Sequence, residues 1–340
     1  MSSRQSAVLV TGANGEIGHS LVRRLAAQGE RVVALDVREI DAACRVHASA
    51  TQVGDILDFG MLQRLGVQYE FGAIFHLAAL LSTRGEFQPE LAHRVNVEGT
   101  LNLLRLAVDA AETRGAPVKF LFPSSIAAYG LKGAAARRAA GRVREEDHLQ
   151  PETMYGCNKL YGEHLGRYYM HHYKRLAAAQ AHVVDFRSIR FPGLISADTV
   201  PSGGTSDYAP EMLHAAARGE EYNCFVREDV RLPFMAMPDA VDAMLQLASA
   251  PAENLTSHVY NIGAFAPSAG EIARLIGEHF PSARIHFAPD ERRQAIVESW
   301  PEDVDDSRAR RDFGFAPRFD LVRTFTDYLI PGVKRRYTKP

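Results

Sequence analysis

The sequence of 340 residues contains no long apolar run, few cysteines and no excess of one charge. No uninterrupted apolar stretch approaches the roughly 18 residues of a membrane-spanning helix, which argues against a membrane partner. The first apolar run, Ala7–Val10, is too short to be the core of a secretory signal peptide. The three cysteines, Cys44, Cys157 and Cys224, are far apart and odd in number, so they predict neither disulfides nor a metal site. These features are typical of a cytoplasmic protein.

The formal net charge is only −2, and residues of both signs are interspersed along the chain. Proteins that hold a polyphosphate backbone usually carry a basic surface, so the composition argues against a nucleic-acid partner. The length exceeds what one hydrophobic core usually supports, and we therefore expect one large domain and a smaller one.

Apolar or β-branched runs alternate with longer helical patterns in the first half of the chain, which is typical of a parallel sheet covered on both faces. We expect strands at 7–10, 31–35, 73–76, 118–122 and roughly 183–189. Helices are expected at 17–28, 90–113 and 155–178. Right-handed crossovers between such elements give a doubly wound, Rossmann-type α/β fold.

A glycine-rich turn, TGANGEIG at residues 11–18, lies between the first expected strand and its helix. Gly12 allows the tight turn, Gly15 lets the backbone approach a pyrophosphate, and Gly18 permits close helix–strand packing. The amides at the helix start then face the phosphates, where the helix dipole favours negative charge. This placement favours dinucleotide binding over a simple turn. The residues assigned to this part of the site are Gly12, Asn14, Gly15, Glu16, Ile17 and Gly18.

Asp36 lies at the end of the second expected strand, eighteen residues beyond Gly18. A carboxylate there accepts hydrogen bonds from a ribose 2′-hydroxyl and repels a 2′-phosphate, so the sequence predicts NAD rather than NADP as cofactor. Arg38 argues against this prediction, since an arginine nearby can accommodate the 2′-phosphate of NADP. A solvated strand-end charge is the alternative interpretation of Asp36.

After Arg190 the pattern becomes less regular. Residues 191–208 are rich in Pro, Gly, Ser and Thr, which predicts loops. Helices are expected at 238–250 and 268–280, and strands at 259–262 and 284–287. We assign an NAD-binding domain to residues 1–190 with a returning segment at 236–263, and a smaller α/β substrate-binding domain to residues 191–235 and 264–330.

Tyr155 and Lys159 lie four residues apart near the start of an expected helix, so both side chains should lie on one helical face. A phenol with a pKa of about 10 is a poor base at neutral pH unless a nearby cation stabilises the phenolate. Lys159 can supply that charge, together with the positive nicotinamide of an oxidised cofactor. Tyr155 can then accept a hydroxyl proton while the carbinol hydrogen leaves as a hydride. Such a pair is common on ordinary helix surfaces, but its place after a dinucleotide site favours the catalytic interpretation.

The segment SSIAAYG, residues 124–130, follows the strand expected at 118–122. Ligands bind at the carboxyl ends of strands in open α/β sheets. Ser125 can therefore hydrogen-bond a substrate oxygen as charge develops on it. A strand-end turn of small residues is the alternative interpretation.

With these motifs the chain resembles the extended short-chain dehydrogenase/reductase family over nearly its whole length. The matching segments are TGANGEIG, Asp36, GDILD at 54–58, HLAA at 76–79, VNVEGT at 95–100, SSIAAYG and the Tyr155–Lys159 pair. The resemblance implies that Asn96 supports the lysine through a water relay and that Ser125 completes the catalytic group. It also implies cofactor contacts for Asp55 and Ile56 beside the adenine, and for Leu77, Ala78 and Ala79. We interpret His76 as a packed strand-end histidine, because the family transfers protons with tyrosine.

Segments of the second half resemble one branch of this family, the short-chain-type L-threonine 3-dehydrogenases. These segments are RFPGLIS at 190–196, PSGGTSDYA at 201–209, YNCF at 222–225, RLPFM at 231–235 and SWPEDVDDS at 299–307, with LLS at 80–82. The resemblance implies NAD-dependent oxidation of the C3 hydroxyl of L-threonine. It implies substrate contacts for Ser82, Ser125, Tyr155, Thr205 and Trp300, nicotinamide contact for Leu194, and a homodimer formed through the two long helices at 90–113 and 155–178. Core packing of Trp300 and loop capping by Thr205 are the alternatives.

Other functions stay open at this point. A nucleotide-sugar epimerase or dehydratase on the same scaffold would need diphosphate contacts, for which Arg218, Arg227 and Arg231 are candidates. A dehydrogenase of another small hydroxy acid is the rival within the enzyme class. A non-catalytic NAD sensor is disfavoured, because such proteins typically lose the Tyr/Lys pair.

Three features depart from the L-threonine dehydrogenase branch. The segment between Ser125 and Tyr155 is longer, because of the arginine- and alanine-rich residues 133–144, which predict an exposed mobile loop. The helix after Lys159 is expected to run on through residues 174–180. The glycine loop reads Asn-Gly-Glu at 14–16 where many members of the branch have Cys-Gly-Gln, although its backbone role is unaffected.

Overall fold

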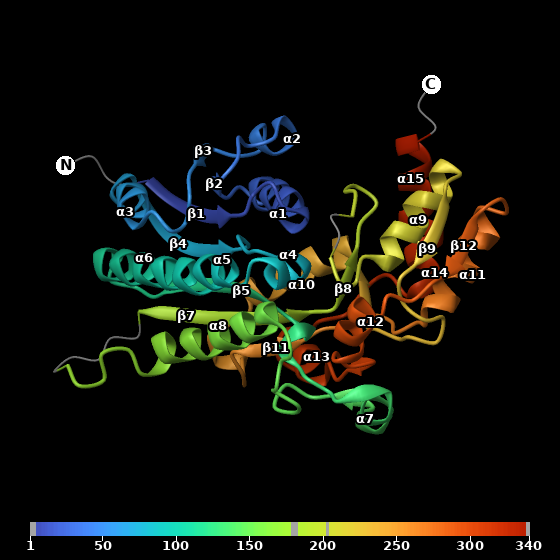
Figure 1. The fold of residues 1–340 in the computed structure, drawn as a ribbon. Coiled ribbons are helices and arrows are strands. Elements are labelled where there is room, and N and C mark those ends of the chain that lie inside the picture. Colours follow the sequence, from blue (N-terminus) through green and yellow to red (C-terminus); the bar gives the residue numbers. More distant parts are fainter. Residues whose placement is uncertain (1–4, 178–182, 202–203, 338–340) are drawn as a thin grey trace.

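The computed structural model describes residues 5–177, 183–201 and 204–337, which form a seven-stranded parallel sheet with helices on both faces. The strand order is β11-β7-β5-β4-β1-β2-β3 (Figure 1). The strands are β1 Gln5–Thr11, β2 Val32–Asp36, β3 Ala50–Val53, β4 Tyr69–His76, β5 Val118–Ser125, β7 Val184–Phe191 and β11 Val259–Asn261. The expected Rossmann-type α/β fold is confirmed.

Two apolar clusters cover the two faces of the sheet. One includes residues of α1 (Glu16–Ala27), α10 (Met237–Ser249) and α13 (Ser307–Phe313). The other includes residues of α3 (Phe59–Gln68), α6 (Gly99–Arg114) and α8 (Met154–His171). Because both faces are covered, the central strands are almost continuously buried, as the unbroken apolar runs of the sequence predict.

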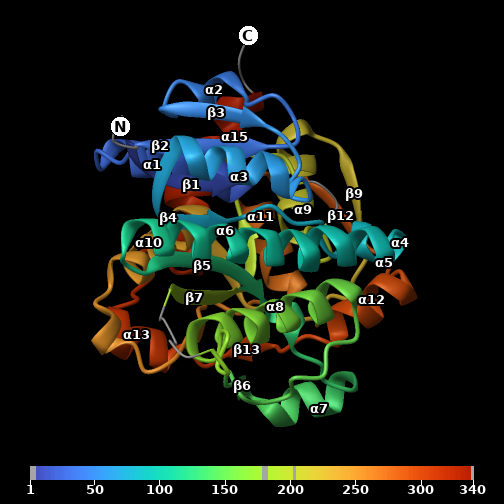
Figure 2. The same ribbon diagram turned by 90° about the vertical axis from the view of Figure 1, so that its left-hand side faces the viewer.

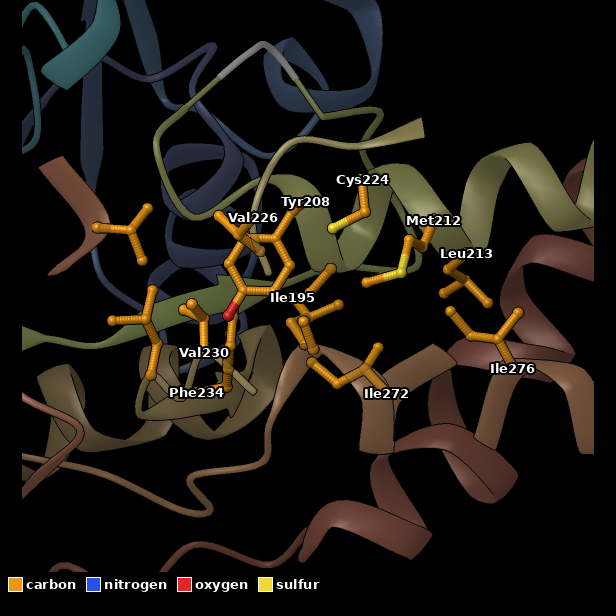
Figure 3. Packing of buried hydrophobic residues seen from close by; sticks show 14 of the residues in the cluster. Ile195, Tyr208, Met212, Leu213, Cys224, Val226, Val230, Phe234, Ile272 and Ile276 are labelled. Atoms are coloured by element: carbon orange, nitrogen blue, oxygen red, sulfur yellow. The ribbon is translucent and has the colours of Figure 1, made fainter. Parts of the chain in front are cut away.

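A third cluster forms a separate core to one side of the sheet, on the right in Figure 1. Figure 3 shows its centre, where Tyr208 and Met212 of α9 (Tyr208–Arg218) lie near Ile195, Phe234 and Ile272. The Tyr208 ring meets the Phe225 and Phe234 rings edge to face, at centroid distances of 5.9 and 5.7 Å. Two parallel strand pairs join this part, β8 with β10 and β9 with β12.

The remaining elements complete the chain. The short strands are β6 Arg142–Val143, β8 Gly193–Ile195, β9 Glu221–Cys224, β10 Phe234–Ala236, β12 Arg284–Phe287 and β13 Asp303–Val304. The helices are α2 Ala42–Arg45, α4 Ser82–Phe87, α5 Pro89–His93, η1 Arg94–Glu98, η2 Ile126–Ala128, α7 Gly133–Ala140, η3 Ala252–Asn254, α11 Ala269–His279, α12 Glu291–Glu298, α14 Leu321–Arg323, η4 Thr324–Leu329 and α15 Ile330–Tyr337.

The segment that returns from the second half supplies an edge strand of the main sheet. Within it, β11 pairs in parallel with β7, and Asn261 lies opposite Arg190. Lys119 and Arg187 from β5 and β7 donate to carbonyl oxygens at the end of α10, which ties this helix to the sheet. The domain bounds assigned from the sequence remain a prediction.

Two expectations for the helices are corrected. The helix expected over 155–178, with a continuation through 174–180, ends as α8 at His171, and residues 172–177 form turns. Residues 178–180 lie outside the described part of the chain. The helix expected over 90–113 consists of α5, the wider π-helical turn η1 and α6 in direct succession. The strand β3 was missed, because its sequence, ATQV, is half polar and lies at the sheet edge.

The expectation of a loop at 133–144 is wrong, although most of these residues are exposed as expected. Residues 133–140 form α7, and β6 pairs in parallel with β13. Figures 1 and 2 show α7 at the end of the molecule opposite α2 and β3. Alanine and arginine are strong helix formers, so the compositional bias signals a helix rather than a loop. Arg137 on this helix is only 2% exposed.

Candidate active site

The glycine loop contains two positions, Gly12 and Gly18, at which the backbone leaves room only for glycine. Gly12 has a φ of +66°, and a Cβ there would lie 2.7 Å from the backbone N of Ala78. A Cβ on Gly18 would lie 2.5 Å from the carbonyl oxygen of Gly12. No side chain caps the start of α1, so its first amides are left to a ligand. This arrangement fits a dinucleotide pyrophosphate.

The carboxylate of Asp36 is fixed beside this loop. Its two oxygens accept hydrogen bonds from the backbone N–H groups of Asn14 (3.0 Å) and Arg38 (3.1 Å). The Arg38 side chain is 73% exposed, and its Nε lies 3.9 Å from Asp36. The side chain of Asn14 bonds to the backbone of Glu39 and Asp41, so it clamps the loop after β2. Asp36 is therefore held where a ribose hydroxyl is expected.

The other expected cofactor residues lie at the carboxyl ends of β3 and β4. Ile56 is buried, and Asp55 accepts a hydrogen bond from the N–H of Leu57 (2.9 Å). The N–H of Ala78 donates to the hydroxyl of Thr11 at 3.3 Å. Ile17, Leu77 and Leu194 pack against one apolar cluster. The structure thus brings Leu194, on β8, to the same cluster as the cofactor loop.

Glu16 begins α1, at the expected pyrophosphate position. Burial, and then the charge of Asp207, raise the pKa of Glu16 to about 7. Asp207 belongs to the segment that contains Thr205, and it accepts a hydrogen bond from the N–H of Gly204 at 2.6 Å. The start of α1 and the segment that contains Thr205 are therefore close enough for the charges of Glu16 and Asp207 to interact.

Tyr155 and Lys159 lie on one face of α8, against the end of β5. The side chains of Tyr155 and Ser125 are hydrogen-bonded, and burial raises the pKa of Tyr155 to about 12 although the Ser125 bond lowers it. The Nζ of Lys159 donates to the carbonyl of Pro123 at 2.7 Å and lies 5.4 Å from the Tyr155 ring centroid. Burial lowers the pKa of Lys159 to about 8, and the charge of Glu163 opposes this. A half-buried phenol beside a buried ammonium is suited to proton transfer.

Asn96 is buried in the π-helical turn η1 and forms a pair of hydrogen bonds with the backbone of Leu80, at 2.8 and 3.0 Å. Its Nδ2 also donates to Asn158 Oδ1 at 3.3 Å. No direct bond to Lys159 is recorded among the described residues. Asn158 was missed by the sequence reasoning, although it immediately precedes Lys159. A single π-helical turn often marks a functional site.

His76 is a packed, neutral histidine, as expected. Its Nδ1 lies 3.0 Å from the hydroxyl of Thr11, and its Nε2 lies 2.8 Å from the hydroxyl of Thr100. Burial, and then the charge of Lys159, lower its pKa to about 3. Both nitrogens are engaged, so this side chain links β1, β4 and α6 and does not act as an acid or base.

The expected substrate residues come from distant segments. Ser82 begins α4, and Thr205 precedes α9, yet the Thr205 hydroxyl donates to the Ser82 hydroxyl at 2.9 Å. Both side chains are buried. The Trp300 side chain is 4% exposed and belongs to the apolar cluster that includes Ile126.

The segment 133–144 holds the chain around Trp300. The Nε of Arg137 donates to the carbonyl of Trp300 at 2.7 Å, and its Nη2 donates to the carbonyl of Arg231 at 2.6 Å. The N–H of Leu131 donates to the carbonyl of Ser299 at 2.9 Å. The lengthened segment is therefore tied by hydrogen bonds to the chain around Trp300 and Arg231.

In the part of the chain that the structure describes, no cluster of three or more His, Cys, Asp or Glu side chains is arranged to hold a metal ion. Over the same residues, no helix is long and apolar enough to cross a membrane.

Comparisons with known proteins agree with this geometry. A model of the NAD dependent epimerase/dehydratase family matches residues 8–263. The mitochondrial L-threonine 3-dehydrogenase of Bos taurus is 35% identical over 330 residues, covering 96% of this chain and 82% of that protein. The L-threonine dehydrogenase of Clostridium difficile superposes with a TM-score of 0.86 at 32% identity, covering 99% of this chain and 100% of that one. The holo form of a GalE-like L-threonine dehydrogenase from Cupriavidus necator gives a TM-score of 0.84 at 37% identity, covering 96% and 99%.

Proposed function

The chain belongs to the NAD-dependent epimerase/dehydratase family and is an NAD-dependent oxidoreductase, and from this premise we propose that it oxidises the C3 hydroxyl of L-threonine to 2-amino-3-ketobutyrate. The observation that carries the proposal is the buried Ser82–Thr205 hydrogen bond. It joins the two segments that the L-threonine dehydrogenase resemblance assigns to the amino acid. Family membership alone does not identify the substrate, because the family includes enzymes with different substrates.

Tyr155 is the general base of the proposed reaction. A phenol is already neutral at pH 7, and in the ligand-free protein burial raises the pKa of Tyr155 further, to about 12, so ionisation requires positive charge nearby. Lys159 supplies one such charge from the same helical face. Bound NAD would supply the hydride acceptor and the positive charge of its nicotinamide ring. Ser125, which bonds to Tyr155, is placed to hold the substrate oxygen while Tyr155 takes its proton.

The chain's own residues also hold the two ligands. The backbone at Gly12 and Gly18 and the first amides of α1 bind the pyrophosphate, and Asp36 binds the adenosine ribose. Asn96 organises the turn before α6, and Leu194 would contact the nicotinamide ring of a bound cofactor. Ser82 and Thr205 offer hydroxyl groups to the small zwitterionic substrate, and Trp300 helps to exclude water.

The surroundings of three arginines favour an amino acid over a nucleotide sugar. Arg218 pairs with Glu220, Arg227 pairs with Asp229 and Glu298, and Arg231 pairs with Glu271. These were the candidates for diphosphate contacts. Since each is already neutralised by a carboxylate, a nucleotide diphosphate would have to displace an ion pair.

We also propose that the protein is a cytoplasmic homodimer. Tyr161 and Tyr168 on α8 are 51% and 44% exposed, on one of the two long helices of the expected contact. Large aromatic side chains are enriched at protein interfaces. Light scattering should give twice the monomer mass, and substitution of both tyrosines by serine should reduce that mass to the monomer's.

The decisive experiment is a spectrophotometric screen at fixed NAD. We expect NADH absorbance to appear with L-threonine and to rise toward alkaline pH, as a tyrosinate base requires. The panel includes L-allo-threonine, D-threonine, L-serine and a UDP-sugar. No NADH with the hydroxy amino acids, together with turnover of the UDP-sugar, would overturn the proposal.

A further inference from the structure

Three side chains of α8 are bonded to three consecutive residues at the end of β5. Tyr155, Lys159 and Glu163 follow one another at intervals of four residues, which places them on one helical face. Tyr155 bonds to the side chain of Ser125, and Lys159 bonds to the carbonyl of Pro123 at 2.7 Å. The hydroxyl of Ser124 donates to Glu163 Oε1 at 2.5 Å. Glu163 is therefore the third member of the row that begins with the catalytic pair.

Glu163 is itself held by a buried arginine. The Nε and Nη2 of Arg190 donate to its two carboxylate oxygens at 2.8 and 2.6 Å, and the two side chains are only 2% and 3% exposed. Arg190 lies on β7, directly opposite Ser124 in the sheet. The guanidinium also donates to the carbonyl of Glu145 at 2.7 Å and lies over the Tyr129 ring. This bidentate pair of hydrogen bonds fixes both the position and the orientation of the carboxylate.

The charges around Lys159 give this carboxylate an electrostatic role in addition to its structural one. Glu163 is the acidic side chain whose charge raises the pKa of Lys159 against the effect of burial. His76, which faces Lys159 from β4, is neutral because burial lowers its pKa to about 3. His258, which faces Glu163 from the segment before β11, is also neutral, because burial lowers its pKa to about 4. Two buried cations, Lys159 and Arg190, thus share one buried carboxylate.

We propose that Glu163 is a positioning residue for proton transfer, which aligns the end of β5 through Ser124 and keeps Lys159 protonated while Tyr155 is ionised. The proposal rests on the Tyr155–Lys159 chemistry proposed above. It concerns a residue that touches neither substrate nor cofactor, and it assigns Arg190 the task of holding Glu163 in place.

Glu163→Gln tests the electrostatic part, because it removes the charge and keeps the size of the side chain. Lys159 should then lose its proton at lower pH. The fall of kcat at high pH, which is the alkaline limb of the pH profile, should therefore begin at least one pH unit closer to neutrality. A one-unit shift is about a tenfold loss of kcat on the alkaline side. The Kd for NAD should stay within about twofold of the wild-type value. Glu163→Asp, which keeps the charge, should restore the position of the limb.

Ser124→Ala tests the alignment part, because it removes one hydrogen bond and no charge. It should lower kcat several-fold without moving the alkaline limb. Asp185→Asn is the matched control, since Asp185 also makes a bidentate pair of hydrogen bonds with a buried arginine of β7, Arg187. That pair lies at the other end of β7, next to the end of α10. Asp185→Asn should lower the melting temperature and leave the pH profile unchanged.

A second readout needs neither substrate nor turnover. The Lys159 Nζ resonance of protein labelled with 15N-lysine, identified by its loss in Lys159→Arg, should titrate at lower pH in Glu163→Gln than in the wild type. Equal titration in the two proteins, or an equal shift of the alkaline limb in Asp185→Asn, would overturn the proposal. If Glu163→Gln does not fold, Glu163→Asp and Ser124→Ala carry the test: both keep the carboxylate, so an unmoved alkaline limb in both supports the charge role and a limb that moves in either one contradicts it. The proposed function fails separately, if Tyr155→Phe retains turnover.

Discussion

Replacing Arg137 by methionine should destabilise the protein strongly. Arg137 lies on a mostly exposed helix, but its own side chain is buried and links two distant segments of the chain. Its guanidinium satisfies the carbonyls of Trp300 and Arg231 with bonds of 2.7 and 2.6 Å, and its Nη1 lies 4.0 Å from Glu302. Methionine fills similar space but donates no hydrogen bond, so both carbonyls lose their partner. Hydrogen bonds from a charged donor contribute about 1.5–3 kcal/mol each.

The desolvation cost of the arginine offsets part of that sum. Burial lowers the pKa of Arg137, which shows that its charge is costly in this position. We therefore expect Arg137→Met to lower the free energy of unfolding by about 2–4 kcal/mol. Arg138, its exposed neighbour on α7, is the matched control, and Arg138→Met should change this free energy by less than about 0.5 kcal/mol.

Urea unfolding followed by tryptophan fluorescence measures both variants, since Trp300 is the single tryptophan of the chain and is 4% exposed. Loosening of the Trp300 segment should also shift the native emission of Arg137→Met to longer wavelength. Equal unfolding free energies for Arg137→Met and Arg138→Met, with identical native spectra, would refute the linking role of Arg137.

Three further predictions address the cofactor and the base. Asp36→Ala should reduce the preference for NAD over NADP in kcat/KM, because it removes the repulsion of a 2′-phosphate, and an unchanged ratio counts against the ribose role. Tyr155→Phe should abolish NADH formation and leave NAD binding by calorimetry nearly intact, whereas retained turnover places the base elsewhere. Burial and Asp207 raise the pKa of Glu16 to about 7. The contribution of this group to the free energy of unfolding is therefore fully present below pH 4.5 and is lost as pH rises through 7. Glu16→Gln should therefore match the wild type in unfolding free energy at pH 4.5 and exceed it at pH 8.5, and an equal difference at both pH values contradicts this.

The sequence predicted the parts of the site that depend on backbone and on local spacing. The need for glycine at Gly12 and Gly18 follows from a strand–turn–helix that brings Ala78 and the loop's own carbonyls against them. Tyr155 and Lys159 are neighbours by helical periodicity alone. His76 was correctly interpreted as packed, because strand-end burial leaves both ring nitrogens engaged.

The parts that depend on long-range packing were not predictable in the same way. Ser82 and Thr205 are separated by 123 residues, and only the resemblance placed them together. Arg137 belongs to a segment whose composition is compatible with an exposed helix, but its burial depends on Trp300 and Arg231 far along the chain. Glu163 lies one helical turn beyond Lys159, but its importance is visible only when Arg190 closes on it from another strand.

The most direct test of the central claim follows the hydrogen at C3 of the substrate. L-Threonine carrying deuterium at C3 is incubated with the enzyme and NAD, and the reduced cofactor is analysed by mass spectrometry. Hydride transfer from C3 with Tyr155 as base predicts one deuterium in each reduced cofactor and none formed by Tyr155→Phe. Reduced cofactor without deuterium, or no reduction at all, would contradict oxidation of the C3 hydroxyl.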